Sequence, residues 1–260
     1  LIKDGDLIVT GTAQGDLISI NANNGDIFQT IGVGETITSL LTTSTIEFVG
    51  GKVRAVIFGT VNGNLYCYNI YSFELIWQNS SAKGMIESKP LIINDRIIFG
   101  SWDTNLYCVD KRNGILNWKW NNGSSFYFAP GRCSPVSDGK NIFLTTPDKN
   151  VYAIDILLGA TNWKKDAGGW ESIGISADKQ KLFIKSYKDK VNIISTADGE
   201  SIKEIDLKYG FDTTPVEFVE WKGNIILPLK NGNVISIGSD YSIRKILFAG
   251  TSRLNSIQHF

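Results

Sequence analysis

The stretch GSWDTNLYCVDKRNGILNWKW, residues 100–120, decides the fold, because two turn signals enclose an alternating apolar run. Residues 97–101 and 106–110 have the composition of strands, and the turn at 102–105 between them is rich in Asp, Thr and Asn. A second turn at 111–114 ends in glycine and leads into a third strand at 115–120. The stretch therefore predicts three antiparallel strands joined by tight turns.

The same turn-and-strand unit occurs six times along the chain. Its copies begin at Gln14, Asn62, Asp103, Asp148, Asp189 and Asn231. Their leading aliphatic residues are separated by 48, 41, 45, 40 and 43 positions. A repeat of this length with several short strands is typical of a β-propeller. We expect an all-β propeller of four-stranded blades with six repeats in this chain; the alternative is part of a seven- or eight-bladed ring.

The two ends of the chain bear on how the ring closes. The chain is predicted to open on the second strand of a blade, GDLIVTG at residues 5–11, without the innermost strand. The C-terminal stretch RLNSIQHF, residues 253–260, aligns with the innermost strands of other repeats. We therefore expect the tail to complete the first blade. Residues 1–260 are expected to form one propeller domain, a fragment of a longer protein.

Composition excludes several classes of function. Lys and Arg together number 26, and so do Asp and Glu, and this balance argues against a general surface for nucleic acid or anionic membrane, which needs positive charge. No apolar run approaches the roughly 18 residues of a membrane helix. One histidine, His259, and three cysteines without a CxxC pair argue against a zinc site, a histidine-based triad or a Cys/His dyad. We expect no catalytic residue, no metal and no cofactor.

Some repeated positions are predicted to be architectural. Cys67 and Cys108 fall in the same repeat column as serine and alanine, which indicates a small buried side chain. Trp77, Trp118 and Trp163 each follow a turn by four residues, and large aromatics at a fixed repeat position favour packing between blades. Aspartates in the hairpin turns are expected to bond their own backbone and not a metal.

The loops that enter the innermost strands break the repeat and place an aromatic or Met residue beside a charge. By the repeat register they meet at one mouth of the central channel, where aromatic surfaces with a few charges suit a peptide, a partner loop or a sugar. The alternative is that the aromatics cap the core and the charges are solvated. The binding candidates are Met85, Glu87, Tyr127, Phe128, Arg132, Trp170, Glu171, Phe211 and Asp212.

The repeat resembles a known family. DTNLYCVDKRNGILNW (103–118) and DKNVYAIDILLGATNW (148–163) are similar to the pyrroloquinoline-quinone-type propeller repeat. That family includes quinoprotein alcohol dehydrogenases, scaffold lipoproteins of outer-membrane protein assembly and propellers attached to other enzymes. The stretch GGWESIGISADKQKLFIKS (168–186) is similar to propellers that follow a calcineurin-like metallophosphoesterase domain in exported bacterial proteins.

Three functions are compatible with this resemblance. The first is a non-catalytic propeller that binds a protein or another macromolecule at the channel mouth, as part of an exported or periplasmic bacterial protein. The second is an accessory domain of a fused metallophosphoesterase. The third is a quinone-dependent dehydrogenase, for which the resemblance implies eight blades, a Ca²⁺ site and two adjacent cysteines. No two cysteines are adjacent here, and no acidic and amide cluster matches a Ca²⁺ cage.

Overall fold

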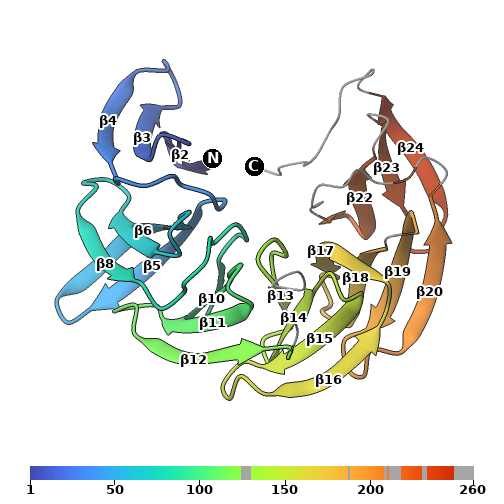
Figure 1. Ribbon diagram of the computed structural model, residues 1–260. Coiled ribbons are helices and arrows are strands. Elements are labelled where there is room, and N and C mark those ends of the chain that lie inside the picture. Colours follow the sequence, from blue (N-terminus) through green and yellow to red (C-terminus); the bar gives the residue numbers. More distant parts are fainter. Residues whose placement is uncertain (124–129, 187, 208–209, 211–217, 230–232, 249–260) are drawn as a thin grey trace. The chain divides into compact units, whose positions relative to one another are not determined.

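The computed structural model describes residues 1–260 except 124–129, 187, 208–209, 211–217, 230–232 and 249–260 (Figure 1). The described residues form short antiparallel strands and turns, with no helix among them. The chain divides into two compact units, Leu1–Pro135 and Val136–Phe260. Each unit holds three four-stranded sheets, so the predicted blade of four strands is confirmed in all six repeats.

In the first unit the sheets follow one another in chain order. The first sheet consists of β1 (Ile2–Asp4), β2 (Leu7–Gly11), β3 (Asp16–Asn21) and β4 (Ile27–Gly32). The second consists of β5 (Thr42–Phe48), β6 (Gly51–Gly59), β7 (Leu65–Asn69) and β8 (Leu75–Asn79). The third consists of β9 (Leu91–Ile93), β10 (Arg96–Gly100), β11 (Asn105–Asp110) and β12 (Leu116–Asn121).

The second unit repeats this arrangement. Its first sheet consists of β13 (Val136–Ser137), β14 (Asn141–Thr145), β15 (Asn150–Asp155) and β16 (Thr161–Asp166). The next consists of β17 (Gly169–Ile175), β18 (Lys181–Ser186), β19 (Lys190–Ser195) and β20 (Ser201–Asp206). The last consists of β21 (Val219–Trp221), β22 (Asn224–Pro228), β23 (Asn233–Ile237) and β24 (Ile243–Phe248).

The strands predicted from residues 97–120 are confirmed within one residue at each end. They are β10, β11 and β12, paired antiparallel in the expected order. In the turn between β10 and β11, Asp103 accepts a hydrogen bond from the Asn105 amide at 3.1 Å. The side chain of Asp148 accepts the Asn150 amide at the same distance in the equivalent turn. These short-range bonds fix the turns because the Asp side chain stands in for a backbone acceptor.

The first sheet corrects the prediction about the start of the chain. Residues Ile2–Asp4 form β1, which pairs with β2 through Ile2–Val9, so the first sheet has its own first strand. The expectation that this blade lacks its innermost strand is therefore wrong. Gly5 and Asp6 make the two-residue turn between β1 and β2, with Gly5 at φ 59°. The tail at 253–260 lies outside the described residues.

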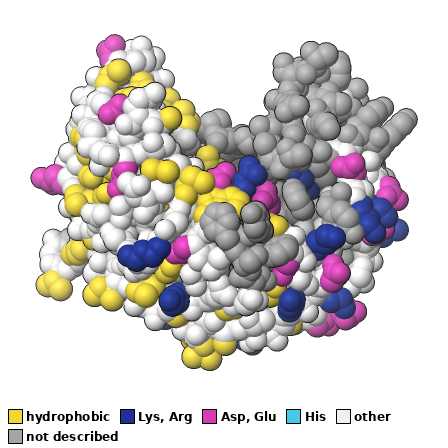
Figure 2. Space-filling view, viewed as in Figure 1, with side chains coloured by type: hydrophobic (Ala, Val, Ile, Leu, Met, Phe, Trp, Pro, Cys, Tyr) yellow, Lys and Arg dark blue, Asp and Glu magenta, His cyan; other side chains and the backbone are white. Residues whose placement is uncertain are grey.

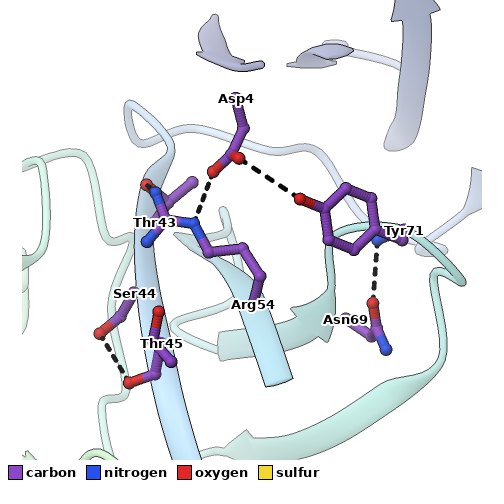
Figure 3. A network of polar contacts seen from close by, with 7 residues as sticks. All are labelled: Asp4, Thr43, Ser44, Thr45, Arg54, Asn69 and Tyr71. Atoms are coloured by element: carbon purple, nitrogen blue, oxygen red, sulfur yellow. Dashed lines mark hydrogen bonds and ion pairs between the residues drawn. The ribbon is translucent and has the colours of Figure 1, made fainter. Parts of the chain in front are cut away.

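Polar side chains tie β1 to the second sheet. Arg54 on β6 donates through Nε to the Asp4 carboxylate at the end of β1, and its guanidinium also donates to the Thr43 hydroxyl at 2.9 Å (Figure 3). The Tyr71 hydroxyl donates to the other Asp4 oxygen at 3.4 Å. The Asp4 side chain is 18% exposed, so this ion pair is partly shielded from water and holds the short strand in place.

The hydrophobic core lies between neighbouring sheets. One buried cluster joins the second and third sheets and includes Ile57, Cys67, Trp77, Ile97 and Tyr107. Another joins the first and second sheets, and a third joins the last two sheets of the second unit. Because each sheet buries side chains on both faces, a single repeat cannot form a core alone and the sheets must stack.

Two tryptophans fill the space between stacked sheets at the same repeat position. Trp77 donates from Nε1 to the Lys111 carbonyl of the next sheet at 3.1 Å, and a Cβ on Gly114 would lie 2.5 Å from its ring. Trp163 donates to the Thr196 carbonyl at 3.2 Å, and a Cβ on Gly199 would lie 3.0 Å from its ring. The glycine in each turn thus leaves the space that the preceding indole occupies.

The first sheet solves the same packing problem differently. Gln29 stands at the repeat position of the tryptophans and donates to the Ser72 carbonyl of the next sheet at 2.9 Å. The glycine position in that turn is Phe73, which is 5% exposed and has a φ of 53°. A smaller side chain on one sheet is therefore matched by a larger one on the next.

The tryptophan column lies opposite the small-residue column. Cys67 pairs with Trp77, Cys108 with Trp118, and Ala153 with Trp163. Each of the three small side chains is fully buried, and the register shifts after each pair because the neighbouring fourth strand has one extra residue there. A small side chain leaves room for the indole on the neighbouring strand.

Candidate functional site

Glu87 is the centre of a polar cluster in the first unit. It lies in the loop between β8 and β9, beside Met85. Trp102, in the turn between β10 and β11, donates from Nε1 to Glu87 Oε2 at 3.0 Å. Arg132 donates from Nε to Glu87 Oε1 at 3.1 Å. We call Glu87, Trp102 and Arg132 the Glu87 cluster.

Glycines allow the chain around Arg132 to approach the turn that carries Trp102. A Cβ on Gly131 would lie 2.8 Å from the indole of Trp102, and a Cβ on Gly100 would lie 2.0 Å from the Pro130 carbonyl oxygen. Neither position tolerates a side chain without movement of its neighbour. The Trp102 amide also donates to the Met85 carbonyl at 3.0 Å, which fixes the loop from β8 against the same turn.

The Glu87 cluster has the chemistry of a recognition surface. The side chains of Glu87 and Arg132 are 32% and 29% exposed, so both stay in contact with solvent while their orientation is held. An ion pair this exposed adds little to stability. An oriented carboxylate and guanidinium beside an indole suit a partner polypeptide, because aromatic and arginine side chains dominate protein interfaces.

Sequence reasoning found Met85, Glu87 and Arg132 but missed Trp102. The structure brings all three to the turn between β10 and β11, where Trp102 contacts both Glu87 and the Met85 carbonyl. The repeat contained a signal for it. Four residues before the leading aliphatic residue, the other copies have Ala13, Val61, Pro147, Tyr187 and Lys230, so only one other copy has an aromatic residue in this column.

The second unit places Trp170 and Glu171 on its inner strand β17. The register passes from Gly169–Ser186 directly to Ile173–Ile184, so residues 170–172 form a wide bulge opposite β18. Glu171 is 7% exposed and has a φ of 51°, which is rare for a residue with a Cβ. Lys185 on β18 is 2% exposed. Bulges and strained backbone of this kind are concentrated at functional positions.

Tyr127, Phe128, Phe211 and Asp212 lie outside the described residues. Each described candidate is therefore assigned to its own unit: Met85, Glu87 and Arg132 to the first, and Trp170 and Glu171 to the second.

Partly buried carboxylates outside the cluster hold turns together. Glu35, in the loop after β4, accepts hydrogen bonds from the Tyr66 hydroxyl at 2.5 Å and from Thr60 and Asn64 at 2.7 Å each. Burial pushes the pKa of Glu35 upward, but these donors outweigh it and hold the pKa below its ordinary value. Burial, followed by the bond to Glu35, raises the pKa of Tyr66.

The same arrangement recurs with a carboxylate from a different place in the chain. Tyr107 and Tyr152 occupy the repeat position of Tyr66, and their hydroxyls donate to Asp103 at 2.6 Å and to Asp148 at 2.5 Å. In the second sheet the equivalent turn residue is Asn62, which carries no charge, and Glu35 of the preceding loop supplies the carboxylate. These groups are structural, because their oxygens are engaged by the turn itself.

Among the residues that the structure describes, no three or more His, Cys, Asp or Glu side chains gather in a way that could hold a metal ion. Within the same residues, no helix is long and apolar enough to cross a membrane.

The comparisons with known proteins agree on one family. A family model described as outer membrane protein assembly factor BamB matches residues 1–120 and, in a second alignment, residues 35–166. The outer membrane protein assembly factor BamB of Vibrio cholerae is 26% identical over 153 residues, which cover 55% of this chain. That alignment covers 37% of the Vibrio protein, so the chain matches well under two thirds of the relative's length.

A solved structure matches almost the whole chain. BamB from Moraxella catarrhalis superposes with a TM-score of 0.71 at 14% identity, covering 99% of this chain and 89% of that one. At this identity the similarity establishes the fold alone, and it confirms the all-β propeller class expected from the repeat. The family model spans more than half of the sequence. The chain therefore belongs to the pyrroloquinoline-quinone-like β-propeller family whose model is described as outer membrane protein assembly factor BamB.

Proposed function

We propose that this chain is a non-catalytic, protein-binding propeller of an exported bacterial protein, and that it acts as an assembly scaffold. The observation that carries the proposal is the family match, since the matching model and the Vibrio relative are both described as an outer membrane protein assembly factor. An assembly factor works by binding proteins, which agrees with a rigid sheet scaffold that presents loops. The periplasm is the compartment that this function requires.

The Glu87 cluster is the part of the first unit that we assign to partner binding. Its charges are oriented but solvated, and the Trp102 indole donates to the Glu87 carboxylate. Removing one of these groups should weaken binding much more than folding, because the ion pair is too exposed to stabilise the fold strongly. The bulge at Trp170 and Glu171 is a second contact in the other unit under the same proposal.

Complementation tests this function. The chain, directed to the periplasm, is expressed in Vibrio cholerae that lacks its own BamB, and folded outer membrane proteins are measured by their heat-dependent migration. We expect the wild-type chain to restore part of the assembly and the double variant Glu87→Ala, Arg132→Ala to lose that gain. The matched control removes another ion pair of the same unit, Glu47→Ala with Lys52→Ala, whose side chains are 60% and 69% exposed.

Two results would contradict the proposal. Equal restoration by the cluster variant and the control variant would remove the Glu87 cluster from partner binding. Failure of the wild-type chain to restore assembly, although it is folded and exported, would remove the scaffold function. The fused metallophosphoesterase stays a prediction of the sequence, and the dehydrogenase alternative is tested by titrating the purified chain with pyrroloquinoline quinone and Ca²⁺, where saturable binding would raise Tm.

A further inference from the structure

Strand β4 is an exposed edge of the first sheet. Among the described strands it pairs only with β3, so its other side faces outward (Figure 1). Ile27 and Phe28 on this strand are 65% and 61% exposed. A sheet edge offers a row of backbone donors and acceptors that can pair with a further strand. Natural proteins usually protect such edges with charged side chains.

Four of the five other repeats carry such a charge and β4 does not. One position after the tryptophan column, the fourth strands have Lys119, Lys164, Glu204 and Lys245, each in register with the same column of the third strand. In β4 the equivalent residue is Thr30, and no residue from Ile27 to Gly32 is charged. The strand β8, with Gln78 at this position, is also uncharged but is shorter and more buried.

Carboxylates stand at both ends of β4. Asp26 immediately precedes the strand and is exposed. Asp16 pairs with Gly32 at the other end, and its Oδ1 lies 3.9 Å from the position that a Cβ on Gly32 would take. At about 3.4 Å per residue the two ends are roughly 20 Å apart. In Figure 2 the coloured side chains over the first sheet, at the upper left, are hydrophobic or acidic and none is dark blue.

We propose that the outer edge of β4 binds an extended segment of another protein by strand addition. The segment is uncharged and apolar over about six residues, the length of β4, and carries lysine or arginine at both ends. Its backbone pairs with the open edge, its side chains pack beside Phe28 and Thr30, and its basic ends face Asp16 and Asp26. This surface is distinct from the Glu87 cluster, so the proposal does not rest on that cluster.

A labelled peptide tests the proposal directly. The probe has six alternating valine and threonine residues between lysines, and fluorescence anisotropy measures its binding to the purified chain. We expect saturable binding that weakens with salt and weakens about tenfold when glutamates replace the lysines. Hydrogen exchange should show new protection of the β4 amides when the peptide is bound.

Variants copied from other repeats identify the edge. Thr30→Lys introduces the residue found at Lys119 and Lys164, and we expect it to weaken binding about tenfold by placing a charge against the added strand. Thr30→Gln copies the neutral residue of β8 and should bind as the wild type does. Lys119→Thr, on β12, is the matched control and should leave affinity unchanged. Asp16→Asn combined with Asp26→Asn should remove the preference for lysine-ended peptides.

Several outcomes would overturn the proposal. The peptide could fail to bind the wild-type chain, or it could bind Thr30→Lys as tightly as the wild type. Peptides with lysine and glutamate ends could bind equally well, or the bound peptide could protect the amides of a strand other than β4. A wild-type dimer in analytical ultracentrifugation that Thr30→Lys abolishes would show that a second copy occupies the edge instead. The double variant Glu87→Ala, Arg132→Ala should bind the peptide normally, so failure here and failure of the scaffold function can be told apart.

Discussion

Replacing Gly114 with alanine tests how the stacked sheets of the first unit are held together. Gly114 has a φ of 70°, and a Cβ would lie 2.5 Å from Cε3 of Trp77 on the preceding sheet. An alanine in the left-handed region costs about 1–2 kcal/mol. Overpacking against the indole, which is only 7% exposed, costs about 1–3 kcal/mol more. We expect Gly114→Ala to lower the free energy of unfolding by about 2–5 kcal/mol.

Gly25 supplies the matched control. It occupies the same repeat position in the first sheet, has a φ of 80°, and a Cβ there would have no neighbour within 4 Å. Gly25→Ala therefore carries the backbone cost of about 1–2 kcal/mol without the clash. A difference of about 2 kcal/mol between the two variants corresponds to roughly 4–8 °C in Tm for a domain of this size. Urea unfolding followed by fluorescence measures both.

A double-mutant cycle separates the clash from the backbone cost. Trp77→Gln copies the solution used by Gln29 and removes the indole, so Gly114→Ala in that background should cost only about 1–2 kcal/mol. The double variant should therefore lose less free energy of unfolding than the sum of the losses of the two single variants. If Gly114→Ala costs no more than Gly25→Ala, or if its cost is unchanged without Trp77, the packing account of the sheet interface is refuted.

Three further predictions concern single groups. Trp77→Phe leaves the Lys111 carbonyl without its indole donor and should cost about 1–3 kcal/mol in urea unfolding; an unchanged midpoint would count against that bond. Burial tends to raise the pKa of Glu35, but its donors hold it below the ordinary value, so its stabilisation is complete above about pH 4.3 and is lost as pH falls through the folded pKa. The Tm deficit of Glu35→Gln should accordingly be present at neutral pH and disappear in acid, and a deficit independent of pH would contradict this. Burial raises the pKa of Cys67 and raises that of Cys108 to about 11, so a disulfide reagent at pH 8 should label them only as the chain unfolds; fast labelling of the native chain would disprove it.

Much of the fold could be predicted because it depends on local signals. Turn residues and alternating apolar runs located β10, β11 and β12 within one residue, and the repeat spacing located the other sheets. The start of the chain was misread because Ile2–Asp4 is a three-residue strand with only one apolar residue inside it. What identifies it as β1 is pairing with β2 and the contact between Asp4 and Arg54, which lies 50 residues further along.

The candidate site was harder to predict because its geometry depends on contacts between loops. Glu87 and Arg132 stood out by charge, but nothing local joined them to Trp102, whose position follows from the glycines at 100 and 131. The carboxylate that accepts the Tyr66 hydroxyl was equally hard to predict from the sequence. Repeat alignment points to the turn at Asn62, whereas the carboxylate comes from Glu35, on the loop of the preceding sheet.

Site-specific photo-crosslinking tests the central claim that the Glu87 cluster binds a protein partner. A photoreactive residue replaces Met85, whose carbonyl accepts the Trp102 amide, and a second chain carries the same residue at Val49, which is fully exposed at the tip of the β5–β6 hairpin. In the periplasm we expect a discrete crosslinked protein from position 85 and none from position 49. The crosslink should disappear when Glu87 and Arg132 are replaced by alanine in a chain that keeps its Tm. No crosslink at position 85, or one that survives the loss of both charges, would contradict the account.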